Sequence, residues 1–352
     1  MSFAFGIFDS FDLGISTPRE VLANRLDFAV AAEAAGIDHY HVTEHHGTPL
    51  SVCPSPNLFL AALSQRTSRM RLGPLVYVLP AYDPLRLAEE IAVLDQLSGG
   101  RLDVGVGSGV SPYELAFLGV DASRARAIYA ETLDAVRTGL STGQLTHSGT
   151  LLRDYDVTLS VRPVQQPHPP LWYASSNTAT AEWAGAHGVN FVGKWNGGKV
   201  VSAVQAYWAK YYEVHGDAGP AAPAPRIGVQ STVYIGATDD EACDRFRKAN
   251  DVFMRQLTHL WHLNDDPSVD ALADSDAAIR GGNALAGSVE TVRDALLAQV
   301  DAAPINFFEA TLWFGDLSPD EAHANLRAFT EEIIPAVREQ TGRNGGGTFT
   351  GS

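Results

Sequence analysis

The chain has 352 residues, of which 45% are hydrophobic and 19% are charged, so it has enough apolar material for a large folded core. Its formal net charge is −16, so we expect neither nucleic acid nor an anionic membrane surface as a partner. Two cysteines cannot build a disulfide framework, the N-terminus lacks the basic region of a signal peptide, and no apolar run is long enough to span a bilayer. The expected location is therefore the cytoplasm.

Short β-rich runs alternate with helical patterns along the chain. Strands are expected, in order, over residues 3–8, 37–42, 71–80, 101–107, 171–176, 189–193, 226–237 and 304–313. The helices between them carry start and stop signals, such as the Pro18 and Gly36 that frame the first one. Eight strand–helix units in one chain of this length favour a (β/α)8 TIM barrel over a doubly wound sheet. Residues 1–340 are expected to form this single domain.

Three segments depart from the alternation. Residues 140–170 are rich in turn formers and are interpreted as an excursion from the barrel. Residues 262–287 are polar, acidic and weakly periodic; long irregular insertions of this kind are often lids, so we expect a lid here. Residues 341–352 are rich in Gly, Ser and Thr and are expected to form a flexible tail.

Residues 41–45, "HVTEH", match the H-x-x-E-H pattern of inverted zinc peptidases. That motif requires a helix, but these residues fall at the end of an expected strand. Four residues along a strand span about 13 Å, too far for two ligands that must each lie about 2 Å from one zinc. We therefore predict no metal site. Glu44, His45 and His46 instead follow the second strand, at the rim where barrel enzymes place their chemistry. A structural histidine bonded to a neighbouring carbonyl is the alternative.

Several motifs together resemble the bacterial luciferase-like, flavin-dependent monooxygenase family. They are "TEHH" (43–46), "LSGGRLDVGVGSGVSPYELAFLG" (97–119), "QPHPPLWYASS" (166–176) and "GSVETVRDALL" (287–297), and the likeness covers roughly residues 3–337. The family has a (β/α)8 barrel, in agreement with the strand count. The resemblance implies that reduced FMN from a separate flavin reductase reacts with O2 to give a flavin C4a-hydroperoxide. This species would oxygenate a small organic substrate, such as an aldehyde. A homodimer through the helices after the second and third strands is also implied.

The resemblance also assigns roles to individual residues. His45 matches a histidine that acts as a general base beside the flavin, and Glu44 is expected to accept a hydrogen bond from a ring N–H. Leu75 and Val76 match a pair joined by a non-proline cis peptide under the flavin ring; an ordinary trans strand is the alternative.

Further matches concern the FMN phosphate and the edge of the flavin ring. Ser176, Asn177 and Thr180 match the phosphate-binding segment, although the same residue types also serve as a plain helix N-cap. Trp195 matches an aromatic residue near the isoalloxazine, and could equally belong to the core.

"GVGSGV" (105–110) departs from the family at two positions. It has neither the dinucleotide spacing nor that of a nucleophile elbow. Luciferase has a reactive cysteine where this chain has Gly107, and the family commonly has a phosphate-binding Arg where this chain has Ser108. Loss of that Arg contact removes about 1.5–3 kcal/mol of binding. Two alternatives therefore stay open: an F420-dependent oxidoreductase on the same barrel, and a flavin-binding protein without turnover. The sequence predicts neither the substrate nor light emission.

Overall fold

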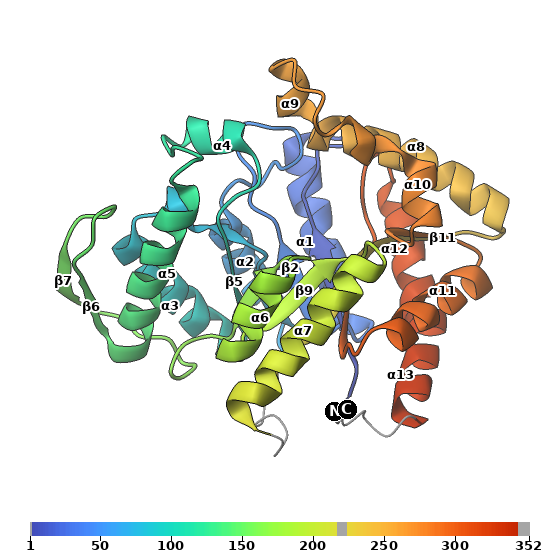
Figure 1. Ribbon diagram of the computed structural model, residues 1–352. Helices are drawn as coiled ribbons and strands as arrows, with labels where there is room; N and C mark the ends of the chain where they lie inside the picture. The colour runs from blue at the N-terminus through green and yellow to red at the C-terminus, as the bar shows by residue number, and fades with distance from the viewer. Residues whose placement is uncertain (1, 217–223, 344–352) are drawn as a thin grey trace.

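The computed structural model describes residues 2–216 and 224–343, which form a nearly closed barrel of parallel strands surrounded by helices (Figure 1). The strands follow one another in the sheet in the order β3-β2-β1-β12-β10-β9-β8-β5-β4, and β11 pairs with β10. Their bounds are β1 Ala4–Asp9, β2 His39–Val42, β3 Arg71–Pro74, β4 Tyr77–Val78, β5 Val104–Gly107, β8 Leu171–Ala174, β9 Asn190–Lys194, β10 Ile227–Ile235, β11 Ala284–Gly287 and β12 Phe307–Thr311.

The barrel closes through β3 and β4, which are two parts of the single strand expected over 71–80. β3 pairs with β2, and β4 pairs with β5. A parallel bridge between Leu72 and Leu102 links β3 to the segment just before β5. The two ends of the strand order therefore belong to one continuous run of chain, as a (β/α)8 barrel requires. The predicted fold class is confirmed.

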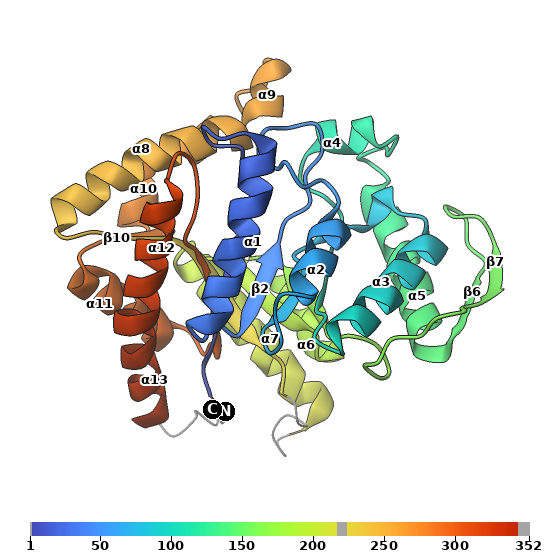
Figure 2. The same cartoon turned by 180° about the vertical axis from the view of Figure 1, so that it is seen from behind.

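Helices cover the outside of the barrel, and Figure 2 shows them from behind. Their bounds are α1 Pro18–Ala34, α2 Pro56–Ser64, α3 Pro84–Ser98, α4 Pro112–Phe117, α5 Ala125–Thr142, α6 Thr178–His187, α7 Gly198–His215, α8 Asp239–Leu257, α9 His259–Leu263, α10 Ser275–Arg280, α11 Val289–Ala302, α12 Pro319–Ala328 and α13 Ile334–Arg343, with a π turn at Phe329–Ile333 and 3-10 turns at Leu79–Ala81 and Asp270–Ala273. Local sequence fixes many helix starts; Thr17 caps α1 in a capping box with Glu20. None of the helices within the described ranges is long and apolar enough to cross a membrane.

Two of the expected irregular segments contain regular structure. The excursion at 140–170 is built on an antiparallel hairpin of β6 (Gln144–His147) and β7 (Tyr155–Thr158), and α5 extends to Thr142. The lid expected over 262–287 ends too late: Ala284–Gly287 is strand β11, fully buried and parallel to β10. The four residues "ALAG" are all apolar and too few to show a strand period, so the prediction was wrong there.

The predicted flexible tail also begins too early. Residues 341–343 continue helix α13, and 344–352 lie outside the described residues.

Candidate active site

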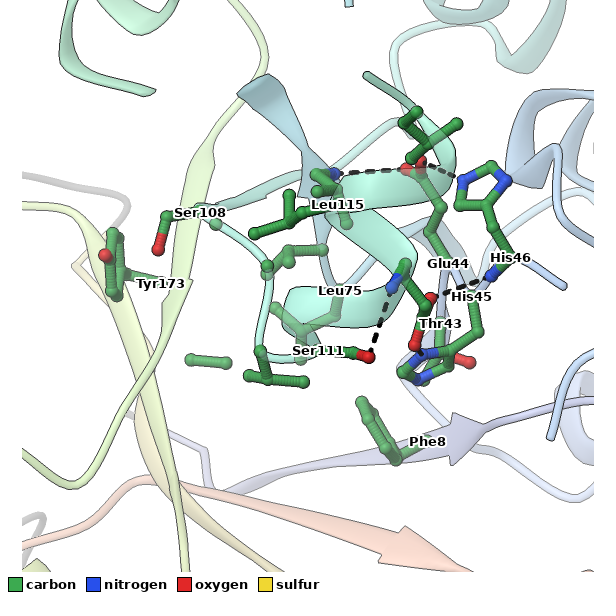
Figure 3. Close-up of a pocket in the computed structure, with 18 residues that line it drawn as sticks. Phe8, Thr43, Glu44, His45, His46, Leu75, Ser108, Ser111, Leu115 and Tyr173 are labelled. Carbon is green, nitrogen blue, oxygen red and sulfur yellow. Dashed lines mark hydrogen bonds and ion pairs between the residues drawn. The ribbon is translucent and has the colours of Figure 1, made fainter. Parts of the chain in front are cut away.

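A cavity of about 280 Å³ opens at the carboxyl ends of the strands, between the barrel rim and α4 (Figure 3). This is the end at which barrel enzymes carry their active sites. The residues around it are mostly apolar, and none of them is Lys or Arg. They are Phe8, Thr43, Glu44, His45, His46, Leu75, Val76, Val78, Gly107, Ser108, Gly109, Val110, Ser111, Glu114, Leu115, Leu118, Tyr173 and Ala174.

His45 lies on the cavity wall and is held by Glu114, a residue that the sequence did not single out. Nδ1 of His45 is 3.1 Å from Oε1 of Glu114, and the side chains are 16% and 10% exposed. The second carboxylate oxygen, Oε2, accepts the main-chain N–H of His46 at 2.8 Å. Glu114 therefore fixes both the imidazole ring and the backbone that carries it.

Glu44 accepts a ring N–H as expected, but the ring is that of His46. Nε2 of His46 lies 2.9 Å from Oε1 of Glu44, and this hydrogen bond raises the pKa of His46. The other carboxylate oxygen accepts from the main-chain N–H of Val78 at 3.1 Å and from the hydroxyl of Tyr82 at 2.9 Å. The Glu44 side chain is only 1% exposed, and its hydrogen bond to Val78 links the loop after β2 to β4.

Leu75 and Val76 are joined by a cis peptide bond, which confirms the predicted geometry. Both residues line the cavity. Gly107 stands opposite them: a Cβ at this position would lie 2.5 Å from Cγ2 of Val76. A side chain here would have to displace Val76, which gives a steric reason for glycine at this position.

Ser108 lines the cavity on the side of Tyr173, as Figure 3 shows. Its short side chain brings no positive charge to this wall. A phosphate at this end of the barrel would therefore need a cation from another element.

Ser176 and Asn177 lie in the short connection from β8 to α6, just after the cavity residues Tyr173 and Ala174, and Thr180 lies in the first turn of α6. Oδ1 of Asn177 accepts the N–H of Thr180 at 3.2 Å, so Asn177 is the N-cap of α6. The hydroxyl of Ser176 donates to the carbonyl of Lys194 at 3.2 Å. The segment lies beside the cavity rather than in its wall.

Trp195 lies away from the cavity. It is buried in the main core and faces Gly282 and Gln299, in a second hollow between β11 and α11. Its position gives no support to the expected contact with the isoalloxazine and agrees with the alternative core role.

The barrel interior holds a cluster of charges that no local pattern revealed. Nδ1 of His41 lies 2.5 Å from Glu309, and its Nε2 lies 3.4 Å from Asp103. Asp103 also binds His39 and Arg71. Burial alone would lower the pKa of His41, but Glu309 and Asp103 outweigh it and raise the pKa to about 9. His41 thus carries a proton at neutral pH.

His39, His41 and Asp103 also lie close enough together to ligate a metal. Their polar atoms are already joined by hydrogen bonds, and Asp103 pairs with the cation Arg71. The pattern H-x-x-E-H does not form one centre, because His41 points to Glu309 inside the barrel while His45 binds Glu114 on α4.

Part of the expected lid meets α4 above the cavity. The hydroxyl of Tyr113 donates to Asp266 at 2.9 Å, and its ring packs edge-on against Trp261 at 5.8 Å. The irregular chain after α9 therefore contacts the helix that carries Glu114. Its action as a lid stays a prediction.

Comparison with known proteins identifies the family. The family model for luciferase-like monooxygenases matches residues 2–306, and the chain belongs to this family. An uncharacterised protein of Sinorhizobium fredii, y4wF, is 33% identical over 95% of this chain and 97% of its own length. The oxygenase component of the flavin-dependent trigonelline monooxygenase of Acinetobacter baylyi is 25% identical over 92% of each chain.

Solved structures share the fold. The monooxygenase RslO1 from Streptomyces bottropensis has a TM-score of 0.81 and 26% identity, covering 94% of this chain and 99% of RslO1. The oxygenating constituent of 3,6-diketocamphane monooxygenase from Pseudomonas putida, in complex with FMN, has a TM-score of 0.76 and 21% identity over 95% and 99% of the chains. An F420-dependent secondary alcohol dehydrogenase has a TM-score of 0.72 and 21% identity over 96% and 99%. The last two show the fold alone.

Proposed function

We propose that this protein is the oxygenase component of a two-component monooxygenase, which takes reduced FMN from a separate flavin reductase and uses O2 to oxygenate a small organic substrate. The observation that carries the proposal is the position of His45 on the wall of a largely apolar cavity, with Nδ1 held by Glu114. Membership of the luciferase-like family supports it, as does a relative that is itself an oxygenase component.

The residues of the cavity suit the flat ring of a flavin. Leu75, Val76 and Leu115 offer apolar surface, and Gly107 has no side chain that would displace Val76 from it. The start of α6 offers main-chain N–H groups for the phosphate. When bound, reduced flavin supplies the electrons that activate O2. The part of the chain is then to hold the ring and exclude water.

His45 is the residue that moves a proton. An Nδ1–H donated to the Glu114 carboxylate leaves Nε2 with a free lone pair. Nε2 can therefore take a proton from the substrate and return it later, as a general base does. Glu44 keeps the loop after β2 in place, so that His45 stays on the cavity wall.

The charges around the cavity favour a neutral substrate. Its polar wall contains the carboxylates of Glu44 and Glu114, and none of the described residues that line it is Lys or Arg. A carboxylate-bearing substrate would be repelled there. We therefore infer an uncharged substrate, such as an aldehyde, that binds through apolar contacts.

An F420-dependent oxidoreductase is the second candidate, because Ser108 supplies no phosphate-binding cation and an F420-dependent dehydrogenase shares the fold. Titration with FMN and with F420, followed by measurement of substrate consumption with and without O2, distinguishes the two candidate functions. A monooxygenase binds FMN and consumes substrate only with O2. In His45→Ala this rate is expected to fall by about 10²–10⁴-fold, the usual contribution of a general base. Unchanged turnover in that variant would rule out the role of His45.

The other readings give different results in the same experiment. Tight F420 binding with O2-independent turnover would establish the deazaflavin enzyme. Tight binding of oxidised FMN without turnover of any screened substrate would indicate a flavin-binding protein.

We also propose a homodimer through α2 and α3. These helices expose Leu58, Val93 and Leu97, which are 75%, 46% and 47% accessible. Apolar side chains gathered on neighbouring helices are typical of a subunit interface. Light scattering should give twice the mass of one chain; a monomer at micromolar concentration would contradict this.

A further inference from the structure

Lys194 is the last residue of β9, and the alternation of side chains along this strand directs it toward the inside of the barrel. Along β9, Phe191 and Gly193 point outward to α7: the Phe191 ring packs against that helix, and a Cβ on Gly193 would meet it at 2.6 Å. Val192 points inward and belongs to an interior cluster with Leu75. Since side chains alternate along a strand, Lys194 also points inward, one layer nearer to the carboxyl end.

This lysine stands next to the cavity and the start of α6. Ala174, a cavity residue of β8, is the register partner of Val192, so Ser176 lies opposite Lys194. Neighbouring strands are about 4.8 Å apart, and the hydroxyl of Ser176 donates to the carbonyl of Lys194. The long, flexible lysine side chain can therefore reach both the cavity rim and the N-terminus of α6.

Lys194 has no partner of opposite charge within residues 2–216 and 224–343. Its side chain is exposed at the surface, yet the protein around it displaces enough water to lower its pKa. Among the described residues no carboxylate forms an ion pair with it, whereas the buried Arg25 and the partly buried Arg71 both have one. A cation left unpaired in such a place is suited to an anionic ligand.

The start of α6 is the adjoining anion-binding element. The helix has ten residues, and Asn177 satisfies the N–H of Thr180. In the part of the chain that the structure describes, the N–H groups of Thr178 and Ala179 have no acceptor. Free first-turn N–H groups and the helix dipole favour a phosphate.

We propose that Lys194 binds the phosphate of the flavin at the start of α6, and so supplies the charge that Ser108 does not. The inference rests on the proposed function, because it needs a phosphorylated flavin.

The test compares FMN with riboflavin, which has the same ring but no phosphate. Fluorescence titrations would use the wild type, Lys194→Met and Lys194→Arg. Lys199→Met is the matched control, because Lys199 is an exposed lysine at the start of α7. Lys194→Met should weaken FMN binding by about 10- to 100-fold, the range for a charge-assisted hydrogen bond. Riboflavin binding should not change, Lys194→Arg should retain FMN affinity, and Lys199→Met should behave as wild type.

Three results would overturn the inference: unchanged FMN affinity in Lys194→Met, an equal loss for FMN and riboflavin, or an equal loss in Lys199→Met. Failure of the proposed function is a separate result, namely a wild-type protein that binds F420 but not FMN. The same variants are then compared with F420 and phosphate-free deazariboflavin, and the same outcomes decide the role of Lys194.

Discussion

Replacement of Glu114 by Gln is the sharpest test of how His45 is positioned. The carboxylate accepts two N–H groups, from His45 Nδ1 at 3.1 Å and from the main chain of His46 at 2.8 Å. An amide has only one oxygen, so in Glu114→Gln one of these donors would face the NH2 group. Loss of one charge-assisted hydrogen bond costs about 1.5–3 kcal/mol, which corresponds to about 10- to 150-fold in rate if it is lost in the transition state.

The assay for Glu114→Gln separates positioning from folding. Substrate oxygenation with supplied reduced FMN gives kcat, and a flavin titration gives Kd. We expect kcat to fall by about 10- to 100-fold while Kd stays within about threefold. Glu290→Gln is the matched control, because Glu290 is an exposed glutamate in the first turn of α11. Unchanged kcat in Glu114→Gln would refute the reasoning. A parallel loss of kcat, flavin affinity and melting temperature would indicate a purely structural role.

Three further predictions concern other parts of the molecule. Gly107→Ala places a Cβ 2.5 Å from Val76, under the expected position of the flavin ring, so the affinities for FMN and for riboflavin should fall equally. A loss of affinity confined to FMN would contradict a contact with the ring. Asn177→Ala removes the N-cap of α6 and should lower the free energy of unfolding by about 1 kcal/mol in urea, and an unchanged midpoint would count against it. Folding raises the pKa of His41 from 6.5 to about 9, so the protonated ring stabilises the folded state. This contribution is complete below pH 6.5 and is lost as the pH rises through 9. The stability difference between wild type and His41→Gln should therefore shrink by about 2–3 kcal/mol from pH 7 to 10, whereas the exposed His187→Gln control should show no such trend.

The barrel could be predicted because its strands and helices carry local signals. Apolar runs such as residues 3–8 and 304–313 alternate with capped helices; the observed β12 falls inside its run, and β1 extends one residue beyond its run. β11 lacked such a signal, since its four apolar residues become a strand only by pairing with β10. Strand β11 therefore depends on tertiary contacts, which override local propensity.

The site could be predicted only where one short stretch carries the information. Glu44 and His45 follow a strand end, and the cis peptide between Leu75 and Val76 came from family resemblance. Glu114 is 69 residues from His45, and Glu309 is 268 residues from His41, so neither contact is visible before the chain folds.

Lys194 is a different case. Strand alternation in "NFVGK" (190–194) puts Lys194 on the same side of the strand as Val192. This alternation says which residues share a side, but only the folded barrel shows which side faces its interior.

The most direct test of the central claim is an anaerobic titration with reduced FMN, followed by rapid mixing with oxygenated buffer while the flavin absorbance is recorded. The account predicts saturable binding and reoxidation that is clearly slower than that of free reduced FMN, because the cavity shields the bound ring from water. Absence of binding, or reoxidation at the rate of the free flavin, would contradict it.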